Sequence, residues 1–204
     1  EYLGTDGKRH AIPPSLLISA MAVMESWKQA VSMDLKRPGS LVYLVGEMQP
    51  TFGGSHYNLV CEEKERQTKD GIPSLHPATR YNYACLHEAI QEKLVLTCHD
   101  LSEGGLAVAA AEMCIGGRLG LFLDLGKRQA LRWLFGETTG CLLVEVAEEN
   151  RLNFEENMIG ASTHLLGRVT AVRKLVIRKG DQTLIALPLA DLCRAWKTPP
   201  HAIG

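Results

Sequence analysis

The sequence predicts an α+β fold, a mixed α/β sandwich, from three features of its pattern. Short apolar runs of strand composition alternate with segments whose apolar residues recur at helical spacing. Two late apolar runs flank Lys179-Gly180-Asp181, which indicates a hairpin near the C-terminus. Of the 204 residues, 46% are hydrophobic, enough to bury a core of domain size. Strands that alternate with helices and end in a hairpin are typical of this fold class.

The first elements are a buried strand, a turn and a second strand. Residues 15–24 are mostly apolar and follow Pro13-Pro14, which favours a buried strand over a helix. The sequence Lys-Arg-Pro-Gly at residues 36–39 is a strong turn signal, and a β-rich strand at residues 41–45 follows it. We therefore predict a domain boundary here, with residues 1–37 completing one domain and residues 38–204 forming the next.

The middle of the chain predicts a loop and two helices. Residues 62–77 are charged, then rich in Gly and Pro, and are expected to form an exposed loop. A helix is predicted over residues 78–93 from Tyr83, Leu86, Ala89 and Ile90 on one face. A buried strand at 94–98 precedes a second helix at 102–115, whose inner face carries Leu106, Ala109, Ala110 and Met113 and which Gly116-Gly117 is expected to end. The later elements, in order, are a strand at 119–125, a helix at 127–135, a strand at 141–147, a helix at 149–158, a hairpin of 165–178 with 183–187, and a helix at 189–196.

Composition excludes several classes of partner. With 22 basic and 23 acidic residues and a net charge of −1, we expect neither nucleic acid nor an anionic membrane as a partner. No apolar run approaches the roughly 20 residues of a membrane helix. No signal pattern opens the chain, so a cytoplasmic location is expected, and the missing initiator Met favours a processed or excised piece. The six cysteines are scattered without the close pairs of zinc or redox motifs, and we expect small buried hydrophobes in a reducing compartment.

The segment at residues 99–107 is the strongest candidate for ligand contact. It joins the carboxyl end of a predicted strand to the amino end of a helix, where open α/β sheets place ligands and free amides attract anions. Capping is a second interpretation, because Asp100 and Glu103 have capping-box spacing and Ser102 is an alternative cap. Capping does not explain two glycines in the first turn, which imply close approach by a backbone, a side chain or a phosphate. The candidate residues are His99, Asp100, Ser102, Gly104 and Gly105.

Two further glycine-bearing loops are weaker candidates. Each follows or precedes a predicted strand. For the loop at residues 136–140, a helix C-cap and a turn glycine are favoured over amides and hydroxyls offered to a phosphate, and the loop at residues 51–57 is on its own weak evidence for a site. The first contributes Gly53, Gly54 and Ser55, and the second contributes Gly136, Glu137, Thr138 and Thr139. Common nucleotide-binding and hydrolase motifs are absent from the sequence, no two histidines have i, i+4 spacing, and neither Asp34 nor Asp124 has an obvious second carboxylate. We therefore expect no metal site built within this chain, and each lone His is better explained as a surface or capping residue than as a catalyst.

Taken together, these segments resemble the phosphoribosylformylglycinamidine synthase family. Residues 99–113 look like its His-Asp-x-Ser-x-Gly-Gly-Leu segment, and residues 136–146 resemble its late loop and strand. Residues 38–46 and 53–57 match the start of its last domain, and residues 1–34 are similar to the end of the preceding ATP-binding domain. The loop at residues 47–52 departs from the family, which usually shows a more acidic sequence there, and this weakens any claim about its contacts.

The resemblance implies both an architecture and a reaction. Residues 1–37 would be the tail of the second ATP-binding-type domain, and residues 38–204 a C-terminal domain of the aminoimidazole ribonucleotide synthetase-like type. The whole enzyme is a ligase that converts formylglycinamide ribonucleotide to the amidine with ATP, Mg²⁺ and ammonia from glutamine. Its catalytic His and its Mg²⁺-binding acids would lie upstream, so the chain is expected to be inactive alone and to bind no cofactor tightly. The implied partners are the remainder of the synthetase subunit, a glutaminase subunit and a small accessory subunit.

Other assignments stay open from the sequence alone. The hydrogenase-maturation carbamoyl-dehydrating protein has a comparable Gly-Gly-Leu-Ala helix start but ends in a reactive Cys, whereas this sequence ends in Gly204. Aminoimidazole ribonucleotide synthetase is a second enzymatic alternative, and a non-catalytic buttress or a structural nucleotide site is a third. If residues 15–24 form a strand without its neighbours, they leave an apolar edge, and we expect self-association through it.

Overall fold

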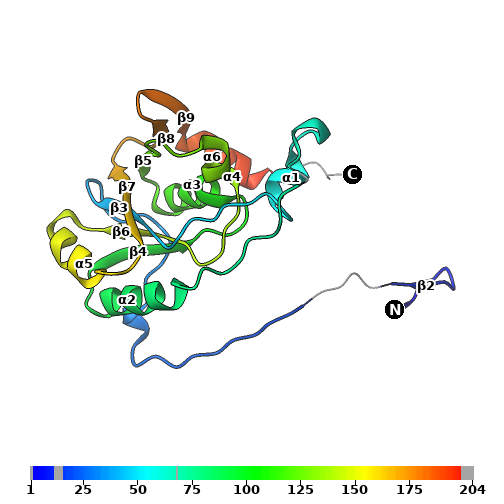
Figure 1. The fold of residues 1–204 in the computed structure, drawn as a ribbon, viewed down its shortest axis with the longest axis horizontal. Helices are drawn as coiled ribbons and strands as arrows, with labels where there is room; N and C mark the ends of the chain where they lie inside the picture. The colour runs from blue at the N-terminus through cyan, green and yellow to red at the C-terminus, as the bar shows by residue number, and fades with distance from the viewer. Residues whose placement is uncertain (1, 12–15, 68, 199–204) are drawn as a thin grey trace.

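The computed structural model describes residues 2–11, 16–67 and 69–198, and its centre is a seven-stranded mixed sheet (Figure 1). The strand order is β4-β6-β3-β7-β5-β8-β9. Helices cover both faces of the sheet, which confirms the predicted α+β sandwich. The strands are β3 (Leu41–Val45), β4 (Val95–Asp100), β5 (Gly120–Asp124), β6 (Leu142–Val146), β7 (Thr163–Thr170), β8 (Lys174–Lys179) and β9 (Gln182–Pro188). The α-helices are α1 (His56–Val60), α2 (Thr79–Gln91), α3 (Gly105–Gly117), α4 (Ala130–Phe135), α5 (Arg151–Asn157) and α6 (Leu189–Lys197).

Strand β3 lies at the middle of the sheet and is buried on both faces. Val42 and Leu44 belong to the core beneath α3, α4 and α6. Leu41, Tyr43 and Val45 face the opposite way, into the core covered by α2 and α5. A strand covered on both faces needs an unbroken apolar run, which is what residues 41–45 supply.

Helix α3 packs its predicted face into the core and ends at the predicted glycine pair, but it begins three residues and ends two residues later than predicted. Leu106, Ala109, Ala110 and Met113 are buried, as their spacing predicts. The helix runs from Gly105 to Gly117 instead of over residues 102–115, so the glycine pair forms its last two residues, and Arg118 follows in the left-handed conformation with φ 54°. A Cβ on Gly117 would lie 2.2 Å from the carbonyl oxygen of Leu35, so the glycine permits close packing of the segment before β3.

The predicted long strand at residues 165–178 is wrong, because it is divided into β7 and β8. Strand β5 lies between them, antiparallel to β7 and parallel to β8. The hairpin itself is confirmed and joins β8 to β9 around Gly180. Local sequence could not reveal the division, because the partner that separates the two strands comes from residues 120–124, far earlier in the chain.

The predicted buried strand at residues 15–24 is also wrong. Ser15 lies outside the described residues, and residues 16–24 belong to no strand. Their side chains are exposed: Leu17 is 91% and Val23 is 103% accessible. Figure 1 shows this segment leaving the body of the molecule as an extended arm, with a two-stranded hairpin, β1 (Tyr2–Leu3) and β2 (Arg9–His10), towards its N-terminal end. An apolar run becomes a buried strand only where other strands satisfy its backbone groups and cover its side chains.

Residues 32–37 connect this arm to the sheet through a buried carboxylate. Glu145 on β6 is fully buried, and its two oxygens accept hydrogen bonds from the backbone nitrogens of Lys36 (2.8 Å) and Arg37 (2.9 Å). The hydroxyl of Ser40 donates to the same carboxylate. The backbone before β3 is therefore fixed to the sheet just where the sequence predicts a domain boundary.

Smaller features complete the fold. The short helix α1 and a 3-10 turn at Glu63–Glu65, inside the predicted loop at 62–77, were not predicted. All six cysteines are free, but Cys61, Cys98 and Cys193 are only partly buried. In the described part of the chain, no helix has the length and apolar character needed to cross a membrane.

Candidate functional site

The three glycine-bearing loops meet at the side chain of Glu137. Its Oε1 atom accepts hydrogen bonds from the backbone nitrogen of Gly104 at 2.9 Å and from that of His56 at 2.8 Å. Gly104 precedes the first residue of α3, and His56 is the first residue of α1. One carboxylate oxygen thus accepts hydrogen bonds at two helix starts, one of which, the start of α3, is where the sequence favours contact with an anion.

Backbone contacts reinforce this junction. Thr51 and Glu137 form an isolated antiparallel bridge, with N···O distances of 2.9 and 2.8 Å. The backbone nitrogen of Gln49 donates to the hydroxyl of Thr138 at 3.2 Å. The segment after β3 and the segment before β6 are therefore held together independently of any ligand.

The glycine pair before α3 is explained by close backbone approach. Gly104 and Gly105 have φ values of +77° and +69°. A Cβ on Gly105 would lie 2.6 Å from the carbonyl oxygen of Gly136. The N-cap residue of α3 is Gly104, which has no side chain, so the capping interpretation through Asp100 or Ser102 is wrong. Left-handed backbone and a neighbouring carbonyl together require glycine at this point.

A cavity of about 360 Å³ lies between two of these loops, at residues 100–103 and 137–141. It brings together five of the predicted residues: Asp100, Ser102, Glu137, Thr138 and Thr139. Leu101, Glu103 and Gly140 of the same two candidate loops also line it, together with three residues that were not predicted: Pro73, Tyr83 and Cys141. The hydroxyl of Thr139 donates to the carbonyl of Ser74 at 2.8 Å, which holds the loop at residues 62–77 (the long loop) against the rim of the cavity. No local signal marks Pro73 or Tyr83, because only the tertiary fold brings them to the cavity.

The charge of the cavity does not suit a bare phosphate. Its lining carries three carboxylates, of Asp100, Glu103 and Glu137, and among the described residues no Lys or Arg lines it. Burial raises the pKa of Tyr83, and nearby Cys141 and Asp100 raise it further. A phosphate placed here would be repelled unless positive charge came from outside this chain. Within the described ranges, no three His, Cys, Asp or Glu side chains converge as metal ligands.

His99 lies outside the cavity. It is near the end of β4, and its side chain is only 13% exposed. Its Nε2 lies 2.6 Å from a carboxylate oxygen of Glu112 on α3, and its Nδ1 lies 3.5 Å from Asp100. The ring therefore connects β4 to α3 and does not point at the cavity, although its neighbour Asp100 does.

The loop with Gly53, Gly54 and Ser55 serves packing. A Cβ on Gly53 would lie 2.2 Å from the carbonyl oxygen of Gly71, so the two loops are in backbone contact there. Ser55 is buried, and its hydroxyl donates to the carbonyl of Phe52. None of these three residues lines the 360 Å³ cavity.

An ion pair fixes the long loop to α4. Asp70 accepts hydrogen bonds from both terminal nitrogens of Arg132, at 2.6 and 3.2 Å, and from the backbone nitrogen of Phe52 at 2.9 Å. The Arg132 guanidinium, and then the Phe52 amide, lower the pKa of Asp70. The ion pair lies beside the junction and holds the loop that supplies Pro73 to the cavity.

Comparison with known proteins identifies relatives for most of the chain. Residues 37–180 match the family model described as AIR synthase related protein, C-terminal domain. Phosphoribosylformylglycinamidine synthase subunit PurL from Lactobacillus helveticus (strain DPC 4571) is 34% identical over 196 residues, which cover 96% of this chain and 25% of that protein. The chain thus spans about a quarter of the length of the curated relatives it matches.

Solved structures show the same fold. The complex of T. maritima PurL with FGAR superposes with a TM-score of 0.68 at 18% identity, covering 81% of this chain and 30% of that one. The structure of PurLQS from Thermotoga maritima gives a TM-score of 0.66 at 18% identity, covering 81% and 28%. At these identities, the likeness establishes the fold alone.

Proposed function

This chain belongs to the family of AIR synthase related proteins, C-terminal domain, and from that premise we propose that it acts as the C-terminal part of a phosphoribosylformylglycinamidine synthase. The proposed whole enzyme is the ligase that converts formylglycinamide ribonucleotide to formylglycinamidine ribonucleotide with ATP and glutamine-derived ammonia. The observation that carries this proposal is the sequence similarity to PurL, which covers 96% of this chain and 25% of PurL. In this proposal the protein works in the cytoplasm.

Within the whole enzyme, the role proposed for this chain is to support the rest of the synthetase and to form one wall of a site for ATP or substrate phosphates. Glu137 already binds the amides at the starts of α1 and α3, so these are not free to bind a phosphate. The acidic lining of the cavity needs positive charge from elsewhere, such as Mg²⁺ or basic side chains of the remaining enzyme. Under this proposal, the loops face ATP or substrate phosphates only in the assembled synthetase, and the chain alone is inactive and binds no cofactor tightly.

Domain organisation is part of the same proposal. Residues 1–37 would complete the second ATP-binding-type domain, and residues 38–204 form the C-terminal domain. The exposed apolar side chains at residues 16–24 support this, because such a surface needs a partner. In the whole enzyme that partner is the rest of the synthetase subunit, with a glutaminase subunit and a small accessory subunit completing the complex. In its absence, the same segment would mediate self-association.

A chimera tests the enzymatic proposal. The corresponding last quarter of the Lactobacillus helveticus PurL is replaced by this chain, and amidine formation is assayed with ammonia and ATP. We expect activity from the chimera and none from PurL lacking its last quarter or from this chain alone. To guard against a poorly matched junction, the isolated chain is also added to the truncated PurL and binding is measured by light scattering. A folded chimera without activity, together with no binding in trans, would contradict the proposal.

Calorimetry distinguishes a supporting domain from a self-contained nucleotide site. The chain is titrated with ATP or ADP in the presence of Mg²⁺. We expect no measurable heat, because the cavity offers carboxylates rather than cations. Tight binding would refute the supporting role and leave the family assignment intact.

A further inference from the structure

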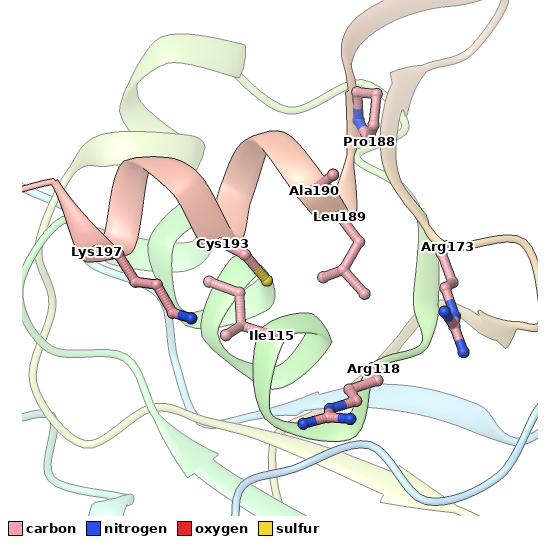
Figure 2. Close-up of a pocket in the computed structure, with 8 residues that line it drawn as sticks. All are labelled: Ile115, Arg118, Arg173, Pro188, Leu189, Ala190, Cys193 and Lys197. Atoms are coloured by element: carbon pink, nitrogen blue, oxygen red, sulfur yellow. The ribbon is translucent and has the colours of Figure 1, made fainter.

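A second cleft, of about 510 Å³, lies between the end of α3 and helix α6. Figure 2 shows Ile115 and Arg118 of the α3 end facing Leu189, Cys193 and Lys197 of α6, with Arg173 on the far side. Among the described residues, none lines both this cleft and the 360 Å³ cavity. Its volume is in the range of sites for small organic molecules, ~300–1,000 Å³.

The floor of this cleft is apolar. Leu189 is buried, and Ile115 and Cys193 are half-buried. Pro188 and Ala190 complete the lining at the start of α6. A ligand on this floor would contact carbon and sulfur atoms, with no buried hydrogen-bonding group to satisfy.

The rim of the cleft, in contrast, carries three cations. Arg118 follows α3, Arg173 lies between β7 and β8, and Lys197 ends α6. All three side chains are exposed, and none has a hydrogen bond or ion pair with any other residue that the structure describes. Several other arginines are paired, such as Arg168 with Glu148 and Arg151 with Glu155, whereas exposed Arg80 on α2 is a single cation, unpaired among the described residues and away from this cleft. Three unpaired like charges around one apolar floor favour an anion at the centre.

The backbone conformation of Arg118 is a second observation about this cleft, independent of its charges. The residue adopts the left-handed conformation, φ 54° and ψ 29°, at a helix end where glycine is favoured. Attraction between a cation and a helix C-terminus accounts for basic residues at Arg118 and Lys197. It does not account for Arg173, which lies in a turn and converges on the same cleft.

We propose that this cleft binds a small amphipathic anion, with a carboxylate or phosphate head between Arg118, Arg173 and Lys197 and an aliphatic or aromatic body on Ile115 and Leu189. The separation of an apolar floor from a cationic rim matches the two ends of such a molecule. This site does not depend on the proposed synthetase function, and its test leaves that function untouched.

Binding to the 204-residue chain is measured by calorimetry with octanoate, octyl phosphate and the neutral octanamide, below their micelle concentrations. We expect both anions to bind more tightly than octanamide, and inorganic phosphate alone to bind weakly. The two anions separate the head groups: octyl phosphate binding tighter identifies a phosphate site, and octanoate a carboxylate site. Equal affinity of octanamide and octanoate would overturn the proposal.

Cys193 provides a reporter inside the cleft. Its alkylation by negatively charged iodoacetate and by neutral iodoacetamide is followed by peptide mass spectrometry. We expect the iodoacetate-to-iodoacetamide rate ratio at Cys193 to exceed that at the half-buried Cys61, and octanoate to protect Cys193 alone. Equal rate ratios at Cys193 and Cys61, together with no protection of Cys193 by octanoate, would show that the anion does not bind in this cleft.

Substitutions locate the charge. Arg118→Gly suits the left-handed backbone, and Arg173→Gln and Lys197→Gln are mild surface changes. Each is expected to weaken octanoate binding about threefold and to leave octanamide binding unchanged. Arg80→Gln, on exposed α2, is the matched control with no expected effect. If Arg80→Gln weakens octanoate binding as much as the three cleft variants do, the octanoate is attracted by the overall charge of the protein, and the proposed site is refuted.

Discussion

The Oε1 atom of Glu137 lies 2.9 Å from the backbone nitrogen of Gly104, although 33 positions separate the two residues in the chain. The same oxygen accepts the backbone N–H of His56. A charged acceptor that satisfies two helix starts is a strong local contact, because hydrogen bonds to ionised groups exceed neutral ones in strength. The junction of the three loops is therefore built around one side chain.

Replacing Glu137 with Ala is expected to lower the free energy of unfolding by about 2 kcal/mol, and the melting temperature by about 4–8 °C. Two amides lose their acceptor in this variant. Glu137→Gln retains an acceptor oxygen and should lose less. Thermal unfolding followed by circular dichroism measures both, with Glu156→Ala on exposed α5 as the control. Equal stability of Glu137→Ala and Glu156→Ala would show that the junction does not depend on this carboxylate.

Gly105→Ala should destabilise the protein by about 3 kcal/mol, from left-handed strain and a clash with the carbonyl of Gly136. Gly180 provides the matched control, because its φ is also positive, +58°, but a Cβ there would meet nothing within 4 Å. Gly180→Ala is expected to cost about 1 kcal/mol. Urea unfolding of the two variants measures the difference. A similar cost for both would leave backbone conformation alone as the reason for glycine at position 105.

The Asp70–Arg132 ion pair should make stability depend on pH. The pKa of Asp70 in the folded state is below its ordinary value of 3.8, so its contribution is fully present above that value. The contribution is lost as the pH falls through the lowered, folded-state pKa. We expect the difference in unfolding free energy between the native protein and Asp70→Asn to be constant at neutral pH and to shrink below pH 3.8. If the difference in unfolding free energy stays constant down to the lowest pH measured, the charge of Asp70 is not its source.

Glu145→Ala should release the segment before β3. The variant leaves the amides of Lys36 and Arg37 and the hydroxyl of Ser40 without their acceptor, at a cost of about 3 kcal/mol. Hydrogen exchange at residues 36 and 37 should accelerate in the variant. Glu149→Ala removes an exposed partner of Arg37, whose pairing is open to solvent, and should leave the exchange rates nearly unchanged. Unchanged exchange in Glu145→Ala would mean that other contacts fix this segment.

Most elements of the fold followed from local pattern. The apolar run at residues 41–45, the helical spacing in α2 and α3, and the turn at Gly180 each act over a few residues, and the structure has them where they were predicted. Of the candidate site, the sequence identified the loops and their glycines, because left-handed turns and close approaches select glycine within the loop itself. Whether the loops contact a phosphate in an assembled enzyme stays a prediction.

What the sequence alone determined, therefore, is the fold class, the order of most elements and the glycine-bearing segments, because these depend on near neighbours. Only the tertiary structure decided that β5 separates β7 from β8, that residues 16–24 find no strand partner in the described chain, and that Glu137 occupies the helix starts. Each of these depends on contacts between residues far apart in the chain. Side-chain periodicity carries no information about which distant segment supplies the partner.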